Sequence, residues 1–124
     1  MIDFKNGTFV KLKKNATFQN ANMISPILVE GETILAEYSA IRDFVVFTNK
    51  RIISVNVQGL TGAKKDFTSM PYSKIQAFSI ETAGVLDLDS ELQLYFSGLG
   101  LVTFEFKGDN NITEIGKLIS QHIL

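Results

Sequence analysis

The sequence predicts a mainly β protein, a sandwich or barrel of about seven short antiparallel strands closed by one C-terminal amphipathic helix. Apolar and polar residues alternate in successive runs between residues 33 and 106, and turn residues separate these runs. After residue 111 the apolar residues recur at helical spacing instead. Short strands divided by frequent turns are typical of a sandwich or barrel and not of a parallel sheet.

The expected strands differ in how clearly they alternate. The last two alternate most regularly, across a glycine-containing turn at residues 97–100. Two earlier runs, Phe44–Phe47 and Lys74–Thr82, are apolar on both faces, although a small antiparallel sheet needs only one apolar face. Their second face therefore packs under the helix or the N-terminal arm, or it meets another chain. The expected strands are residues 34–41, 44–47, 52–57, 66–70, 74–82, 91–96 and 101–106.

The C-terminal segment has the signature of a helix that docks on the sheet. Asn111 precedes the first helical residue and Glu114 follows three residues later, which is a capping-box pattern. Gly116 lies on the apolar stripe and lowers helix propensity, so we expect it to permit close approach to the sheet. The stripe consists of Ile112, Ile115, Ile119 and Ile123.

Residues 1–25 form an N-terminal arm of undetermined structure, and residues 26–124 form the expected domain. Asn6-Gly7 lies between Phe4 and Phe9, which fits either a hairpin or an unanchored tail. The basic run Lys11–Lys14 is interpreted as part of a solvated tail.

Composition excludes several classes of protein. A chain of 124 residues with net charge −1 is expected to form one domain without the positive field that nucleic acids require. With no cysteine, the chain can have neither disulfides nor thiolate sites. The N-terminus does not resemble a secretory signal, and the longest apolar runs are too short to span a bilayer. We therefore expect a soluble, cytoplasmic protein.

Three motifs could carry chemistry, and none is convincing. Gly59–Lys65 lacks the spacing of a phosphate loop and precedes a strand, not a helix. Asp87, Asp89 and Glu91 offer too few ligands for a calcium loop and fit a solvated turn. His122 has no serine or carboxylate placed by the sequence to make it a catalytic base. We expect no catalytic residue, no metal site and no cofactor.

Residues 41–62 read IRDFVVFTNKRIISVNVQGLTG, and further blocks include GAKK at residues 62–65, PYSKI at 71–75, FSIETAG at 78–84 and DLDSEL at 87–92. Together these blocks resemble the bacterial pleckstrin-homology-like domains over roughly residues 26–123. The resemblance implies a pleckstrin-homology fold that is usually a binding platform. It also implies a ring-shaped homo-oligomer, expected to be a pentamer, with a polar surface where strands of adjacent protomers meet.

Phosphoinositide binding is not expected. Many eukaryotic members of the wider family bind these lipids through several basic residues near the first hairpin loop. Here that stretch supplies only Arg42, which Asp43 already flanks, whereas a multiply phosphorylated headgroup needs a basic cluster.

The leading hypothesis is a non-enzymatic domain that forms a cyclic homo-oligomer and binds a protein partner that the sequence does not identify. The alternatives are a small-ligand or lipid-binding module with a pocket between sheet and helix, and a hydrolase or metal enzyme built on the acidic loop. The expected contacts are the strand edges near Phe44–Thr48 and Tyr72–Ile80. The candidate interaction surface comprises Arg42, Asp43, Phe44, Asn49, Lys50, Arg51, Tyr72, Lys74 and Gln76.

Overall fold

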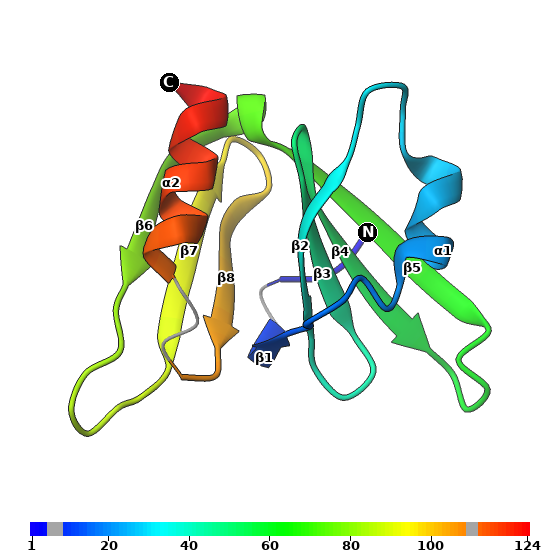
Figure 1. The fold of residues 1–124 in the computed structure, drawn as a ribbon, viewed down its shortest axis with the longest axis horizontal. Coiled ribbons are helices and arrows are strands. Elements are labelled where there is room, and N and C mark those ends of the chain that lie inside the picture. Colours follow the sequence, from blue (N-terminus) through cyan, green and yellow to red (C-terminus); the bar gives the residue numbers. More distant parts are fainter. Residues whose placement is uncertain (5–8, 109–111) are drawn as a thin grey trace.

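The computed structural model describes residues 1–4, 9–108 and 112–124. It contains eight strands, two short helical segments near the N-terminus, a 3₁₀ turn and a C-terminal helix (Figure 1). In chain order the elements are β1 Phe9–Lys14, α1 Ala21–Ile24, η1 Ser25–Ile27, β2 Ile34–Ser39, β3 Phe44–Thr48, β4 Arg51–Gln58, β5 Lys64–Pro71, η2 Tyr72–Lys74, β6 Ile75–Glu81, β7 Ser90–Phe96, β8 Gly100–Phe106 and α2 Ile112–Ile123.

The strands form one sheet in the order β5-β4-β3-β2-β1-β8-β7-β6. Figure 1 shows its two halves facing each other, with β2–β5 on one side and β6–β8 on the other. All neighbours are antiparallel except β1 and β8, which run parallel. The mainly β fold and the seven strands between residues 33 and 106 are confirmed, and β1 is an additional strand from the arm.

Strand β1 joins the two halves of the sheet. It pairs with β2 through Lys13 and Lys14 and with β8 through Phe9 and Leu12. Leu12 is fully buried, while Lys11 and Lys13 are exposed on either side of it. The interpretation of residues 11–14 as a solvated tail is therefore wrong, because alternation places Leu12 in the core and the flanking lysines in solvent.

The connection from β1 to α1 is held by a buried carboxylate on β2. Glu37 is fully buried, and its two oxygens accept hydrogen bonds from the backbone N–H groups of Gln19 and Asn20, each at 3.0 Å. Asn15 Nδ2 also donates to Glu37. A carboxylate that accepts several hydrogen bonds can remain buried, and here it fixes the arm to the sheet. The Asn6-Gly7 hairpin of the sequence analysis lies outside the described residues.

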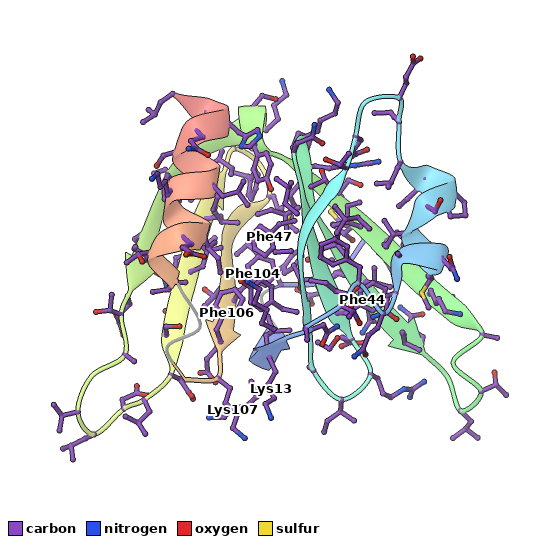
Figure 2. The ribbon with its side chains drawn as sticks, viewed as in Figure 1. Lys13, Phe44, Phe47, Phe104, Phe106 and Lys107 are labelled. Atoms are coloured by element: carbon purple, nitrogen blue, oxygen red, sulfur yellow. The ribbon has the colours of Figure 1, made fainter. Side chains whose placement is uncertain are left out.

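The main core lies between the two halves of the sheet. Phe47, Phe104 and Phe106 point into this space, whereas Phe44 points to the opposite face of its sheet (Figure 2). Tyr38 packs edge-on against Phe47 and Phe106, with ring centroids 5.7 and 4.9 Å apart.

The second face of β3 is covered by this chain and not by another. Phe44 and Val46 pack with Ile24 of α1, and Ile27 of η1 borders the same cluster. The sequence left open whether this face packs under the helix or the N-terminal arm, or whether it meets another chain. In the structure the arm covers it. Figure 1 shows α1 outside the half-sheet formed by β2–β5.

Strand β6 is not apolar on both faces, contrary to the sequence analysis. Its register shifts between Ile75 and Ala77, as a β-bulge requires. After the shift Phe78 and Ile80 face the same core as Ile75, while Ala77 is exposed. The bulge therefore converts an irregular apolar pattern into one apolar face.

Helix α2 packs against β6, η2 and β7. Ile115 and Ile119 are buried, at 3% and 0% exposure, as the sequence predicts. Gly116 lies directly over Ile80, where a Cβ atom would come within 3.3 Å of Ile80 Cδ1. The expected close approach at Gly116 is confirmed. Asn111, the predicted cap, lies outside the described residues.

Candidate interaction surfaces

The structure separates the predicted interaction residues into two groups. One group lies around the β3–β4 turn and η2, because Tyr72 N–H donates to Lys50 O at 3.2 Å and Tyr72 Oη donates to Thr48 O at 2.7 Å. The other group lies at the opposite end of β3, in the β2–β3 loop and at the first residue of β3. The first group contains Asn49, Lys50, Arg51, Tyr72, Lys74 and Gln76, and the second contains Arg42, Asp43 and Phe44.

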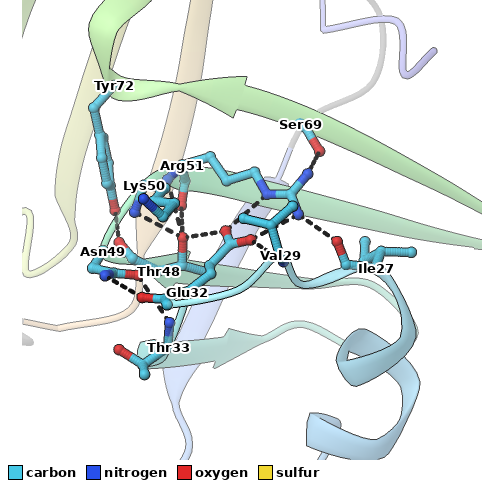
Figure 3. A network of polar contacts seen from close by, with 11 residues as sticks. Ile27, Val29, Glu32, Thr33, Thr48, Asn49, Lys50, Arg51, Ser69 and Tyr72 are labelled. Carbon is cyan, nitrogen blue, oxygen red and sulfur yellow. Dashed lines mark hydrogen bonds and ion pairs between the residues drawn. The ribbon is translucent and has the colours of Figure 1, made fainter.

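Arg51 belongs to a buried polar network (Figure 3). Its Nε lies 2.8 Å from Glu32 Oε2 and its Nη2 lies 2.9 Å from Glu32 Oε1, so the two groups make a two-point ion pair. Arg51 also donates to Ile27 O at 2.6 Å and to Ser69 Oγ at 3.0 Å. Thr48 Oγ1 donates to Glu32 Oε2 at 2.7 Å. These contacts join the connection before β2 to β4 and β5.

The Glu32 side chain has no exposed surface, so the pair carries a desolvation cost. Burial by itself raises the pKa of Glu32. The hydrogen bonds from Arg51 and Thr48 outweigh that effect and hold the pKa below its ordinary value of 4.5. Arg51 is therefore a residue that stabilises the fold, although the sequence places it on the candidate surface.

Two aromatic members of the candidate surface are core residues. Phe44 is 2% exposed because α1 covers it, and Tyr72 is 1% exposed because η2 turns it under the β3–β4 turn. Strand β3 is also interior to the sheet, between β2 and β4, so Phe44–Thr48 is not an edge. The assignments of Phe44 and Tyr72 to an exposed surface are therefore wrong.

Strand β6 is an edge of the described sheet, and Gln76 and Ala77 on it are exposed. A groove of about 390 Å³ lies beside it, where β5 passes through η2 into β6. Lys74 and Gln76, two predicted surface residues, line this groove. The segment Ile75–Ile80 contains neither a charge nor a proline, the side chains that commonly protect an edge.

The outer face of β6, β7 and β8 carries three rows of side chains that run across the strands. The row nearest η2 is apolar, and its Tyr95 and Leu101 are 47% and 52% exposed. The middle row is polar, and the row farthest from η2 is acidic. In register the rows are Ala77–Tyr95–Leu101, Ser79–Gln93–Thr103 and Glu81–Glu91–Glu105.

The acidic row is electrostatically unfavourable at its centre. Partial burial raises the pKa of Glu91, and repulsion from Glu81, Glu105 and Asp87 raises it further. Like charges directly opposite each other on neighbouring strands destabilise a sheet.

A second groove, of about 560 Å³, opens at the other end of the sheet. It lies between β1 and the β2–β3 loop. Its lining residues are Lys11, Lys13, Ser39, Ala40, Ile41, Arg42 and Asp43. The sequence analysis includes Arg42 and Asp43 in the candidate surface but misses Lys11 and Lys13, because these two come from a strand that it did not predict.

Lys11 has a left-handed backbone, with φ of 56°, at the register shift between β1 and β8. Such a conformation is uncommon for a residue with a side chain. Lys11 Nζ contacts Asp89 and lies 3.6 Å from Glu105 Oε1. The hydrogen bond and charge of Asp89 raise the pKa of Lys11, and the hydrogen bond from Lys11 lowers the pKa of Asp89. The β6–β7 loop is therefore tied to β1.

The remaining motifs show structural roles. Asp87 Oδ1 accepts a hydrogen bond from Asp89 N–H at 3.1 Å. His122 Nδ1 lies 2.8 Å from Leu118 O, and its ring lies against Tyr72. In residues 1–4, 9–108 and 112–124, no group of three acidic or histidine side chains is arranged to hold a metal ion. No helix in this part of the chain is long and apolar enough to cross a bilayer.

Ile80, Ile115 and Ile119 fill the space between α2 and the sheet. Ile2 and Phe4 pack on the same core, and Phe4 meets Phe104 edge-on at 6.2 Å. The pocket between sheet and helix that a small ligand would need is therefore occupied by this chain's own side chains.

A curved antiparallel sheet closed by one C-terminal helix defines the class of pleckstrin-homology folds. Residues 3–123 match the family described as the bacterial PH domain. The chain belongs to this family. It is 48% identical over 99 residues to YjqA of Bacillus subtilis (strain 168), covering 78% of this chain and 79% of YjqA.

Two solved structures support the assignment. A DUF1696 family protein with a pleckstrin-homology domain from Shewanella loihica PV-4 has a TM-score of 0.80 at 36% identity, covering 93% of this chain and 99% of that protein. A pleckstrin homology domain from Shewanella amazonensis SB2B has a TM-score of 0.66 at 37% identity, covering 96% of this chain and 93% of that domain. The predicted family is therefore confirmed.

Proposed function

We propose that this bacterial pleckstrin-homology domain is a non-enzymatic module that assembles with copies of itself into a ring and binds a partner protein at the junction between protomers. The observation that carries the proposal is the unprotected edge of β6. Its backbone has no partner strand within the described sheet on one side, and residues 75–80 carry no charge or proline to prevent pairing. The module is expected to act in the cytoplasm.

The other edge of the sheet, strand β5, differs from β6 in charge, and this difference suits a head-to-tail contact. Strand β5 begins with Lys64 and Lys65, whereas β6 ends with Glu81. An interface between two different patches closes into a ring when the rotation per subunit permits. We expect β6 of one protomer to approach β5 of the next, with these opposite charges fixing the orientation.

The apolar row beside the edge extends the proposed contact. Ala77, Tyr95 and Leu101 lie next to β6 on the outer face and are all exposed. Aromatic side chains are enriched at protein interfaces and contribute much of the binding energy there. Lys74 and Gln76, in the groove beside η2, are the polar residues expected to face a partner at the junction.

The test is the mass of the protein in solution. Light scattering at micromolar protein should give several times the chain mass of 13.8 kDa, with a pentamer as the expected size. Ala77→Glu should give a monomer, because it places a charge in the apolar row beside the edge. Ala16→Glu, an identical change at an exposed alanine that follows the central strand β1, should leave the assembly unchanged.

Two results would contradict the proposal. A wild-type mass that stays at one chain at every concentration would exclude the ring. An Ala77→Glu protein that keeps the wild-type mass would exclude β6 as the contact. Once the ring is established, a pull-down from native lysate with wild-type protein and Lys74→Glu would identify a partner bound at the junction.

A further inference from the structure

Residues 1–4 reach from one half of the sheet to the other, and we call them the N-terminal bridge. At β5 the Met1 ammonium lies 2.9 Å from Asp66 Oδ2, and Ile2 N–H donates to Thr68 Oγ1 at 3.0 Å. Figure 1 shows the chain running from the N-terminus beside β5 toward the other half of the sheet. Polar contacts with a single strand therefore hold the first two residues.

The apolar side chains of the N-terminal bridge pack against the main core. Ile2 and Phe4 are both partly buried there, and Phe4 meets Phe104 of β8 edge-on at 6.2 Å. Edge-on aromatic pairs add to the free energy gained from burial. The N-terminal bridge therefore contacts the sheet as a bound peptide contacts a receptor, with its polar backbone groups on one strand and its side chains in an apolar space.

The inner face of β4 and β5 is polar where the N-terminal bridge lies. Ser54 and Thr68 are paired in register on these two strands. Each is two residues from a core residue, Ile52 or Met70, so strand alternation places them on the face that points toward the main core. Thr68 Oγ1 also donates to Asp66 Oδ1 at 2.8 Å, which orients the carboxylate. The sheet therefore offers a carboxylate and two hydroxyl groups at the border of its core.

Ser54 indicates that the N-terminal bridge does not use the whole site. Its side chain is fully buried, and among the residues that the structure describes its Oγ is the one buried side-chain polar atom without a hydrogen-bond partner. Buried polar groups nearly always have a partner. The bridge contacts Asp66 and Thr68 but leaves the hydroxyl opposite Thr68 unpaired. An occupant that reaches Ser54 would gain one more hydrogen bond than the bridge makes.

The Asp66 carboxylate favours a positively charged occupant. Hydrogen bonds from the Met1 ammonium and from Thr68 hold the pKa of Asp66 below its ordinary value of 3.8, so the group is charged at neutral pH. Hydrogen bonds between ammonium and carboxylate groups are stronger than those between neutral groups. The Asp66 side chain is 22% exposed, and a groove of about 400 Å³ beside it is lined in part by Met1, Asp66 and Thr68. A competing ammonium group can therefore reach the carboxylate from solvent.

We propose that this inner face is a binding site for the amino terminus of a polypeptide, which the N-terminal bridge of the same chain occupies until another amino terminus displaces it. Asp66 binds the terminal ammonium group, Thr68 accepts the N–H of the second residue, and the space beside Phe104 takes an apolar side chain. Capture of a terminal amine is a recurring mode of peptide recognition. The site lies inside the sheet and is separate from the edge of β6.

The N-terminal bridge competes with an incoming terminus because it is tethered to the site. Residues 5–8 link it to β1, and a short link gives a tethered segment an effective concentration of about a millimolar. A free peptide should therefore bind wild-type protein only weakly. Phe4→Ser removes the aromatic contact of the bridge and keeps Asp66 and Thr68, so it should make the site available.

Fluorescence anisotropy with a four-residue peptide tests the proposal. The peptide has the sequence of residues 1–4 and carries a dye at its carboxyl end, and the same peptide with an acetylated amino terminus is the matched control. The free peptide should bind Phe4→Ser about tenfold more tightly than wild type, because the bridge has lost a partly buried aromatic ring. Acetylation should weaken binding to Phe4→Ser about tenfold or more, because it removes a charge-assisted hydrogen bond.

Two further variants distinguish this site from a general loosening of the fold, and urea denaturation shows that each protein is folded under the conditions of the assay. Phe18→Ser makes the same change at a 45% exposed phenylalanine between β1 and α1 and should leave peptide binding at the wild-type level. Asp66→Asn combined with Phe4→Ser should bind the free peptide about tenfold or more weakly than Phe4→Ser alone.

Three outcomes would overturn the proposal. Absence of peptide binding to folded Phe4→Ser would exclude the site. Equal binding of the acetylated peptide would show that the protein takes an apolar segment without recognising its terminus. Unchanged binding after Asp66→Asn, or tighter binding in Phe18→Ser, would place the peptide elsewhere on the protein.

Discussion

Gly116 of α2 lies so close to Ile80 of β6 that a Cβ atom at position 116 would come 3.3 Å from Ile80 Cδ1 and 3.4 Å from Ile80 Cγ2. The glycine weakens the helix by about 1 kcal/mol relative to alanine. That cost is offset by the contact of the helix backbone with the sheet. The pair therefore sets the distance between α2 and β6.

Enlarging position 116 should separate the helix from the sheet. Gly116→Val should lower the free energy of unfolding by about 1–3 kcal/mol through overpacking, whereas Gly116→Ala should be nearly neutral because its propensity gain offsets a small displacement of Ile80. Urea denaturation measures both. Combining Gly116→Val with Ile80→Ala should cost less than the sum of the single changes, and strict additivity would show that the two residues do not interact.

Removing Arg51, the partner of Glu32, should reveal the free-energy cost of burying the Glu32 carboxylate. Arg51→Ala should lower the free energy of unfolding by about 3–5 kcal/mol at neutral pH, because it leaves a buried carboxylate without its cation. Lys50→Ala, the adjacent exposed residue, should have little effect. Urea denaturation of both variants gives the comparison.

The pH dependence of this pair has a definite sign. The wild-type pKa of Glu32 is lowered, so its stabilising contribution is full above the ordinary value of 4.5 and is lost as the pH falls through the lowered value. In Arg51→Ala burial dominates, and the carboxyl group takes up a proton at higher pH. The stability difference between wild type and variant should therefore shrink on acidification, and a constant difference would disprove the assignment.

Acidification should remove a destabilising interaction in the acidic row, whereas it removes a stabilising one at Glu32. Because the pKa of Glu91 is raised in the folded state, its ionisation destabilises the fold at neutral pH, and this penalty disappears as the pH falls through the raised value to 4.5. Glu91→Gln should increase the free energy of unfolding at neutral pH by about 0.2–1 kcal/mol. The gain should vanish below about pH 4.5 and be absent in Glu30→Gln, a change at an exposed loop carboxylate. A gain that persists in acid would point to packing instead of charge.

Most of the fold is readable from the sequence because its signals are local. The alternation in β7 and β8 gives the inward Leu92, Leu94 and Phe104, and the spacing of Ile115 and Ile119 gives the buried face of α2. Strand β1 also alternates around Leu12, and this signal could have identified it. The three lysines beside Leu12, however, are typical of a solvated tail. The main partner strand, β8, is remote in sequence, so the pairing cannot be recognised from neighbouring residues.

The candidate surface was harder to predict because it depends on distant contacts. Nothing local distinguishes Arg51, which pairs with a buried carboxylate 19 residues away, from an exposed arginine in a turn. Phe44 is covered by α1, a short helix that the sequence does not mark. The bulge after Ile75 changes which face of the sheet the later residues of β6 point to, and no turn residue in the sequence indicates the bulge.

The parallel pairing of β1 with β8 has a consequence for how the protein folds. Two strands from opposite ends of the chain lie side by side at the centre of the sheet, so neither half of the molecule can complete its hydrogen bonding alone. Contacts between residues so far apart in sequence slow folding, because the chain between them must be ordered before the contact is gained. During synthesis the N-terminal strand leaves the ribosome first but finds its second neighbour only after Phe104 has emerged. Until then the edge of β1 that later pairs with β8 is open, and a nascent chain is at that stage vulnerable to pairing with another chain.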